Sequence, residues 1–129
     1  MTTALVCIGL LGLLLFVLGF AVSIARGRDG TVVGTPTDPT NTLHKVIRAH
    51  GNTAEFAPML AVLIYVAALG DPAAWVTWMM WIATAGRYSI AIGLIVGATL
   101  EKPHPLRFLG ALATYIAGMA LAVAVLMSA

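Results

Sequence analysis

A polar stripe runs along one face of the segment 41–59, inside a chain that is otherwise strongly apolar. At 100° per residue of an α-helix, the face carries His44, Arg48, Asn52 and Glu55 in order. Guanidinium groups grip carboxylates with two parallel hydrogen bonds, and a carboxylate among them suits an ammonium group. Together with Arg87, and with Arg107 as a further candidate, Arg48, Asn52 and Glu55 of this stripe predict a pocket that fits a small zwitterion with more than one carboxylate. If that ligand carries a thiol, a nearby arginine lowers the thiol pKa from about 8.5 and populates the nucleophilic thiolate.

Two charged residues are predicted to lie at the same depth inside a membrane. Counting from the apolar ends of their segments at a rise of 1.5 Å per residue places Glu55 about 8 Å and Arg87 about 9 Å inside the inner boundary. Either charge alone in lipid costs several kcal/mol. We therefore expect Glu55 and Arg87 to pair directly or to share a ligand.

Two further polar residues belong to the candidate site on weaker grounds. Arg107 opens the last apolar segment, where a basic side chain that snorkels to the membrane surface is the ordinary structural explanation. Tyr88 follows Arg87 but faces about 100° away, and its hydroxyl needs a partner if it is buried. His50 points away from the polar stripe and has no metal-ligand spacing to another His, Cys or carboxylate, so the sequence predicts no metal site.

The composition excludes a water-soluble domain. Only 9% of the 129 residues are charged and 60% are hydrophobic, whereas soluble domains carry about 25% charged residues. The net charge of +2 is too small for a nucleic-acid module, and no P-loop, HExxH, CxxC or serine elbow is present. The single cysteine, Cys7, allows no intrachain disulfide. The partners expected from composition are therefore membrane lipids and lipophilic small molecules, not nucleic acid.

Four apolar stretches position the polar residues, because a membrane helix needs about 20 apolar residues. We predict one membrane domain over 1–129, with helices over about 3–25, 39–69, 72–100 and 105–127. Asp38-Pro39 and Asp71-Pro72 resemble an N-cap followed by proline at the first helical position. The first stretch lacks the basic start of a signal peptide and exceeds the usual core of about 7–15 residues, which favours a membrane span. Short connections predict an up-down-up-down antiparallel bundle.

The basic residues predict the orientation of this bundle. Six of them lie on the side of the first and third loops: Arg26, Arg28, Lys45, Arg48, Lys102 and Arg107. The positive-inside rule then places these loops in the cytoplasm and both termini on the opposite side. Small residues recur at four-residue spacing, Gly93 with Gly97 on the third helix and Gly110, Thr114 and Gly118 on the fourth, and they predict close packing of these helices. Pro58 predicts a bend just beyond Glu55.

The segment Arg48 to Pro58, RAHGNTAEFAP, resembles a family signature, R-A-(H/Q)-x-N-x-x-E-x-x-P. This signature is typical of the membrane-associated proteins in eicosanoid and glutathione metabolism (MAPEG), and the likeness extends over nearly the whole chain. It implies a four-helix bundle that forms a homotrimer, with glutathione as co-substrate between subunits on the cytoplasmic side. The residues that it implies for glutathione binding are Arg48, Asn52, Glu55 and Arg87. Tyr88 is a further candidate for glutathione binding, although it lies two residues before the aromatic position of the family pattern. It also implies that Arg107 stabilises the glutathione thiolate.

The chain departs from the family pattern at three ligand positions. Ile90 and Leu94 stand where the pattern R-x-x-(Y/H)-x-x-G-(Y/F) has aromatic or histidine residues, and Ala111 stands four residues after Arg107, where some members have tyrosine. We expect a glutathione-dependent transferase or peroxidase for lipophilic electrophiles. The alternative is a non-catalytic lipid-binding or scaffold protein of the same fold. A transporter or proton relay is less favoured, because Glu55 and Arg87 lie at one depth and do not form a chain of ionisable groups across the bilayer.

Overall fold

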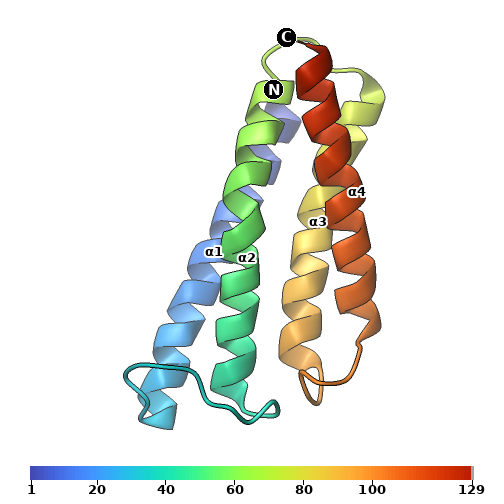
Figure 1. Ribbon diagram of the computed structural model, residues 1–129. Coiled ribbons are helices and arrows are strands. Elements are labelled where there is room, and N and C mark those ends of the chain that lie inside the picture. The colour runs from blue at the N-terminus through green and yellow to red at the C-terminus, as the bar shows by residue number, and fades with distance from the viewer. Residues whose placement is uncertain (129) are drawn as a thin grey trace.

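The computed structural model describes residues 1–128, and within this range the chain forms helices and no strands. The helices are α1 (Thr2–Asp29), α2 (Thr42–Ala67), α3 (Ala74–Val96) and α4 (Pro105–Met127). They run alternately up and down, α1 packs beside α2 and α3 beside α4, and both termini lie at the end away from the two long loops (Figure 1). The predicted all-α class and antiparallel four-helix topology are therefore confirmed.

The first two helices differ from their predicted bounds at the loop that joins them. α1 continues four residues past the predicted end and stops at Gly30, whose φ of 73° is the left-handed conformation that glycine adopts readily. α2 begins at Thr42 rather than at residue 39, because Asn41 is its N-cap and accepts a hydrogen bond from the backbone of His44. The predicted cap, Asp38, instead accepts from the backbone and hydroxyl of Thr40, and this closes a turn.

The third helix is shorter than predicted at both ends, whereas the fourth matches. α3 begins after Ala73, which caps it without a side-chain hydrogen bond, so the predicted cap at Asp71 is wrong. It ends at Val96 rather than at residue 100. α4 starts at Pro105, whose missing N–H costs nothing at a first helical position, and the His104 side chain accepts from the backbone of Leu106.

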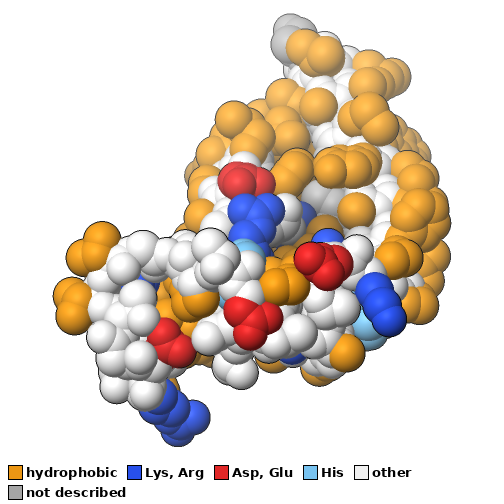
Figure 2. Space-filling view, turned by 60° about the horizontal axis from the view of Figure 1, so that its bottom comes forward, with side chains coloured by type: hydrophobic (Ala, Val, Ile, Leu, Met, Phe, Trp, Pro, Cys, Tyr) orange, Lys and Arg blue, Asp and Glu red, His pale blue; other side chains and the backbone are white. Residues whose placement is uncertain are grey.

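Three of the four helices, α1, α3 and α4, are long and apolar enough to cross a membrane. The prediction of four apolar spans is therefore corrected for α2, since His50, Asn52 and Glu55 lie among its apolar residues. Its 26 residues still correspond to about 39 Å, and it runs the length of the bundle (Figure 1). The surface is largely apolar, and the charged side chains gather at the end that carries the long loops (Figure 2).

Glycines bring α3 and α4 into direct backbone contact. A Cβ atom on Gly110 would lie 2.7 Å from the carbonyl oxygen of Gly86, and one on Gly86 would lie 2.9 Å from that of Gly110. A Cβ on Gly93 would lie 2.9 Å from the backbone nitrogen of Arg107. We call these three glycines, Gly86, Gly93 and Gly110, the glycine seam. Gly93 and Gly110 take part as predicted, whereas Gly118 makes only ordinary contact with Leu60.

Candidate functional site

A cavity of about 320 Å³ lies between α2, α3 and α4, toward the end of the bundle that carries the long loops. We call it the inner chamber. Its wall contains four of the residues singled out from the sequence, namely Arg48, Asn52, Arg87 and Arg107. The fold therefore brings most of the predicted site together from three helices, although α2 and α4 are separated by α3 in the chain.

Arg87 is the most deeply buried of these residues, with only 1% of its surface exposed. Its Nη2 atom donates to both the backbone oxygen (2.7 Å) and the side-chain oxygen Oδ1 (2.6 Å) of Asn52. Its guanidinium carbon lies 4.9 Å from the centre of the Phe56 ring, which is a cation–π contact. Its Nε has no hydrogen-bond partner in residues 1–128. The Arg87 guanidinium is thus held by neutral groups, and its Nε–H makes no hydrogen bond within the described residues.

The predicted direct pair between Glu55 and Arg87 is not formed. No ion pair within 4 Å joins them in the described chain, and the Glu55 side chain is exposed and does not line the inner chamber. The physical reason is that Asn52, three residues earlier on α2, presents both of its oxygens to Arg87. That the two charges share a ligand stays a prediction.

Tyr88 also lies away from the inner chamber. Its hydroxyl donates to the backbone oxygen of Leu10 on α1 at 2.9 Å. Because Tyr88 faces about 100° from Arg87 on α3, it turns toward α1 while Arg87 turns toward α2. This hydrogen bond satisfies the buried hydroxyl and joins two helices. Tyr88 thus has a packing role here and lines neither arginine-lined cavity, so its contact with a ligand stays a prediction.

Arg107 lies at the mouth of the inner chamber, at the start of α4. Its Nη1 atom donates to the backbone oxygen of Leu100, in the loop between α3 and α4, at 3.0 Å. Main-chain carbonyls neutralise no charge, so the guanidinium is oriented while its positive charge is still available to a ligand. Arg48, an exposed residue of α2, lines the same chamber.

A second cavity, of about 360 Å³, adjoins the first and shares Arg48, Leu94 and Arg107 with it. We call it the outer chamber. It is bounded on its other sides by residues of the two long loops, including Pro39 and Glu101. The two arginines therefore stand between an inner space among the helices and an outer space under the loops.

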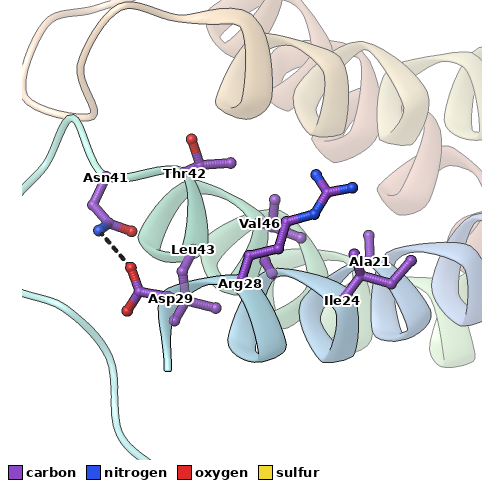
Figure 3. Close-up of a pocket in the computed structure, with 9 residues that line it drawn as sticks. Ala21, Ile24, Arg28, Asp29, Asn41, Thr42, Leu43 and Val46 are labelled. Carbon is purple, nitrogen blue, oxygen red and sulfur yellow. Dashed lines mark hydrogen bonds between the residues drawn. The ribbon is translucent and has the colours of Figure 1, made fainter. Parts of the chain in front are cut away.

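A third cavity, of about 560 Å³, lies between the ends of α1 and α2 (Figure 3). Its lining is mainly apolar and includes Ile24 from α1 and Val46 from α2, and at one end the Asn41 side chain donates a hydrogen bond of 3.2 Å to Asp29. Arg28 is the only basic residue among those that line it. It contains none of the predicted site residues, so the two arginine-lined chambers remain the candidate site.

Aromatic residues of the inner chamber were not identified from the sequence. Phe56 and Tyr115 line it, with ring centres 5.9 Å apart at an angle of 54°, and Phe108 lines it from the start of α4. A sequence signal for Tyr115 exists, since it lies eight residues, or about two helical turns, after Arg107 on the same face. The residue one turn earlier is Ala111, so the hydroxyl missing at that position has a counterpart one turn deeper.

Comparison with known proteins agrees with this architecture. A family model described as the MAPEG family matches residues 4–127. No curated protein and no solved structure gives a significant match to the chain.

Proposed function

Because the chain belongs to the MAPEG family, we propose that it is a membrane-bound, glutathione-dependent transferase or peroxidase that acts on lipophilic electrophiles. The observation that carries this proposal is the charge of the inner chamber. Three arginines, Arg48, Arg87 and Arg107, line it, and none of the residues that line it is a carboxylate. Glutathione offers two carboxylates to such a wall, and planar guanidinium groups bind carboxylates with good geometry.

Arg107 is the residue that we expect to activate the thiol. A cation beside a thiol favours the thiolate and lowers the thiol pKa, and the thiolate is the reactive form. The hydrogen bond to Leu100 holds the Arg107 guanidinium in place before the ligand binds. In a conjugation, the sulfur then forms a bond to the electrophilic carbon, and the leaving group departs with the electrons of its former bond. Arg107 stabilises the negative sulfur before the attack.

The apolar part of the inner chamber suits a lipophilic second substrate. Phe56 and Tyr115 stack at its inner end, and Phe108 is 67% exposed at the helix surface, where a bilayer would surround it. An apolar electrophile dissolved in the membrane therefore meets aromatic surface next to the arginines. This arrangement supports membrane lipids and lipophilic molecules as the surroundings and substrates of the site.

Glu55 supports assembly with further copies of the chain. It is an exposed carboxylate on α2, among exposed apolar residues such as Met59 and Val62. A charge that faces lipid costs several kcal/mol, whereas one that faces a neighbouring subunit can be hydrated or paired. We therefore propose the homotrimer, with α2 against its copies. The basic residues at the loop end support a cytoplasmic position for both long loops and the opposite side for the termini.

Calorimetry and thermal unfolding of the purified protein with millimolar glutathione test the binding step. Binding to the folded chain raises Tm by mass action, so we expect both heat and a rise in Tm. For the chemical step, Arg107→Ala is expected to lower the conjugation rate with an aryl halide by about tenfold or more, as loss of a charge-assisted contact does. Lys102→Ala is the control, since it removes an exposed charge of the same sign that lines neither chamber. No heat and no shift in Tm would contradict the proposal.

The alternative, a non-catalytic lipid-binding or scaffold protein, is favoured by a different part of the same wall. Ile90, Leu94 and Ala111 line the inner chamber with apolar groups at positions where ligand-binding side chains were expected. A protein of this kind would gain thermal stability from a fatty acid or phospholipid in detergent but none from glutathione.

A further inference from the structure

A fourth cavity, of about 290 Å³, lies at the end of the bundle that carries the chain termini, away from the two arginine-lined chambers (Figure 1). We call it the terminal cavity. It is formed by the end of α2, the short α2–α3 loop, the start of α3 and the end of α4. Most residues that line it are apolar, among them Val66, Val76 and Met127. Among the described residues, it shares no lining residue with either chamber, so its ligand is a separate question.

Asp71 is the only charged residue among the described residues that line the terminal cavity. Its side chain is exposed and has no hydrogen-bond or ion-pair partner within residues 1–128. It does not cap α3, because Ala73 takes the N-cap position without a side-chain hydrogen bond. Asp71 also follows Leu69, the last apolar residue of its stretch, so it lies where the bundle leaves the hydrocarbon core. An unengaged carboxylate at this level is complementary to a positive ligand.

Trp75 adds an aromatic surface to the same cavity. It lies in the first turn of α3, four residues after Asp71, and is 45% exposed. Tryptophan attracts cations to its ring face more strongly than the other aromatic residues, and it is enriched where a membrane meets water. A carboxylate and an indole that line one space suit an ammonium group, because the carboxylate supplies charge and the indole supplies a cation–π surface.

The apolar surface beside the cavity favours an amphiphile as the source of this ammonium group. Leu126 and Met127, at the end of α4, are 76% and 78% exposed, and Leu69, just after α2, is 60% exposed. A small amine dissolved in water would leave these side chains without an apolar partner. A phospholipid instead places its ammonium group at the membrane surface and its acyl chains beside the helices.

We propose that the terminal cavity binds the head group of a zwitterionic phospholipid. Its ammonium group lies between the Asp71 carboxylate and the Trp75 ring, and its acyl chains run along the ends of α2 and α4. This inference does not depend on glutathione binding, since the arginine-lined chambers are at the other end of the bundle. The site distinguishes lipids by the positive charge of the head group, which phosphatidylethanolamine has and phosphatidylglycerol lacks.

Competition between these two lipids tests the assignment on the full-length protein in detergent. Native mass spectrometry measures the ratio of bound phosphatidylethanolamine to bound phosphatidylglycerol when both are supplied in equal amounts with the same acyl chains. We expect Asp71→Asn to lower this ratio by about two- to fivefold relative to wild type, as the loss of an exposed ion pair does. Trp75→Leu is expected to lower it as well, whereas Trp75→Phe should retain most of it, because phenylalanine keeps an aromatic face.

Glu101→Gln is the matched control, since it neutralises an exposed carboxylate at the opposite end of the bundle. We expect it to keep the wild-type ratio. The proposal is wrong if Asp71→Asn leaves the ratio unchanged, or if Glu101→Gln lowers it equally. O-phosphoethanolamine, the head group without acyl chains, should not compete at the same concentration as the lipid. Equal competition would overturn the assignment to a lipid.

A purely structural role of Asp71, as a negative charge near the N-terminus of α3, predicts a different pattern. Asp71→Asn would then lower Tm in lipid-free detergent and leave the lipid ratio unchanged. Thermal unfolding without added lipid therefore accompanies the competition experiment. We expect Asp71→Asn to lower the lipid ratio while its lipid-free Tm stays close to that of Glu101→Gln.

Discussion

The glycine seam and the inner chamber lie on adjacent sides of the same segment of α3, and Ile90 and Arg107 border both. On one side, backbone meets backbone, and a single added methyl at Gly110 or Gly86 would overlap a carbonyl oxygen of the facing helix. On the other side, α2 and α4 leave about 320 Å³ between them. In a bilayer, close packing of small residues is a main source of helix association. We infer that the tight side holds α3 and α4 together, so that Arg87 and Arg107 keep their separation, while the loose side leaves room for the ligand that we propose.

The largest expected effect comes from adding a methyl group to the seam. Gly110→Ala places a Cβ 2.7 Å from the Gly86 oxygen and 2.9 Å from the Ile90 nitrogen, both backbone atoms that cannot move alone. We expect it to lower the free energy of unfolding by about 2–3 kcal/mol, as overpacking does, and to lower Tm in detergent. Gly9→Ala is the control, because nothing lies within 4 Å of its added Cβ. Equal Tm values for Gly110→Ala and Gly9→Ala would show that close packing at the glycine seam does not stabilise the fold.

The next largest expected effect concerns Arg87 in the wall of the inner chamber. Arg87→Met keeps the approximate length of the side chain but removes the guanidinium group that Asn52 holds. We expect glutathione affinity to fall by about tenfold or more, since hydrogen bonds to charged groups contribute about 1.5–3 kcal/mol. Titration calorimetry measures this change. Arg87→Lys retains the charge without the planar fork, so its affinity should lie between the two. Undiminished binding by Arg87→Met would show that the chamber wall is not the anion site.

Tyr88 and Tyr115 test whether packing contacts and ligand contacts of the bundle are separate. Tyr88→Phe removes the hydrogen bond to Leu10, so we expect a loss of about 1 kcal/mol in stability and unchanged glutathione affinity. Tyr115→Phe removes a hydroxyl that lines the inner chamber, so we expect the reverse pattern, with stability retained and the conjugation rate reduced. Thermal unfolding measures the stability of both variants, titration calorimetry measures their glutathione affinity, and initial rates measure their conjugation activity. If Tyr88→Phe weakens binding as much as Tyr115→Phe, the division between a packing side and a ligand side does not hold.

The smallest expected effect concerns Asp38 in the α1–α2 loop, outside both the glycine seam and the inner chamber. The backbone N–H of Thr40, followed by its hydroxyl, holds the pKa of Asp38 below its ordinary value. A lowered folded-state pKa contributes stability above the unfolded pKa of about 4, and this contribution is lost as pH falls through the folded value. We therefore expect the Tm difference between wild type and Asp38→Asn to narrow as pH falls from about 6 to about 3. A difference that is constant with pH would exclude this contribution.

The fold was largely predictable because a bilayer leaves a chain few solutions. Apolar stretches and turn residues were enough for four antiparallel helices. Helix ends were less predictable, since Asp38 and Asn41 are both good caps and only the folded loop decides between them. Arg48 and Asn52 were predictable because they share one helical face, and Arg87 because it lies at the depth of Glu55. Arg107 was predictable from its place at the start of the last apolar segment and from the family resemblance.

The partner of Arg87 was not predictable in the same way. Depth counting placed Glu55 level with Arg87, and opposite charges made the pair attractive. Helical periodicity, however, does not say which of two side chains three residues apart reaches a guanidinium group, and Asn52 could offer its backbone oxygen as well as its amide. Tyr115 was not predicted because the family pattern points to the position one helical turn after Arg107, which is Ala111, whereas Tyr115 lies two turns after it.

Two hydrogen bonds join the two long loops, one from the Leu100 N–H to the Pro39 oxygen and one from Lys45 Nζ to the Ala98 oxygen, and they have a consequence for the order in which the protein matures. Pro39 and Leu100 are about half the chain apart, and contacts so distant in sequence are the costly ones to close. The outer chamber is lined by α2, α3, the start of α4 and the two long loops, so it forms only after these elements have packed together. A ligand that binds in this chamber would stabilise only subunits that have completed folding. Ligand binding would therefore distinguish complete subunits from partly folded ones during biogenesis.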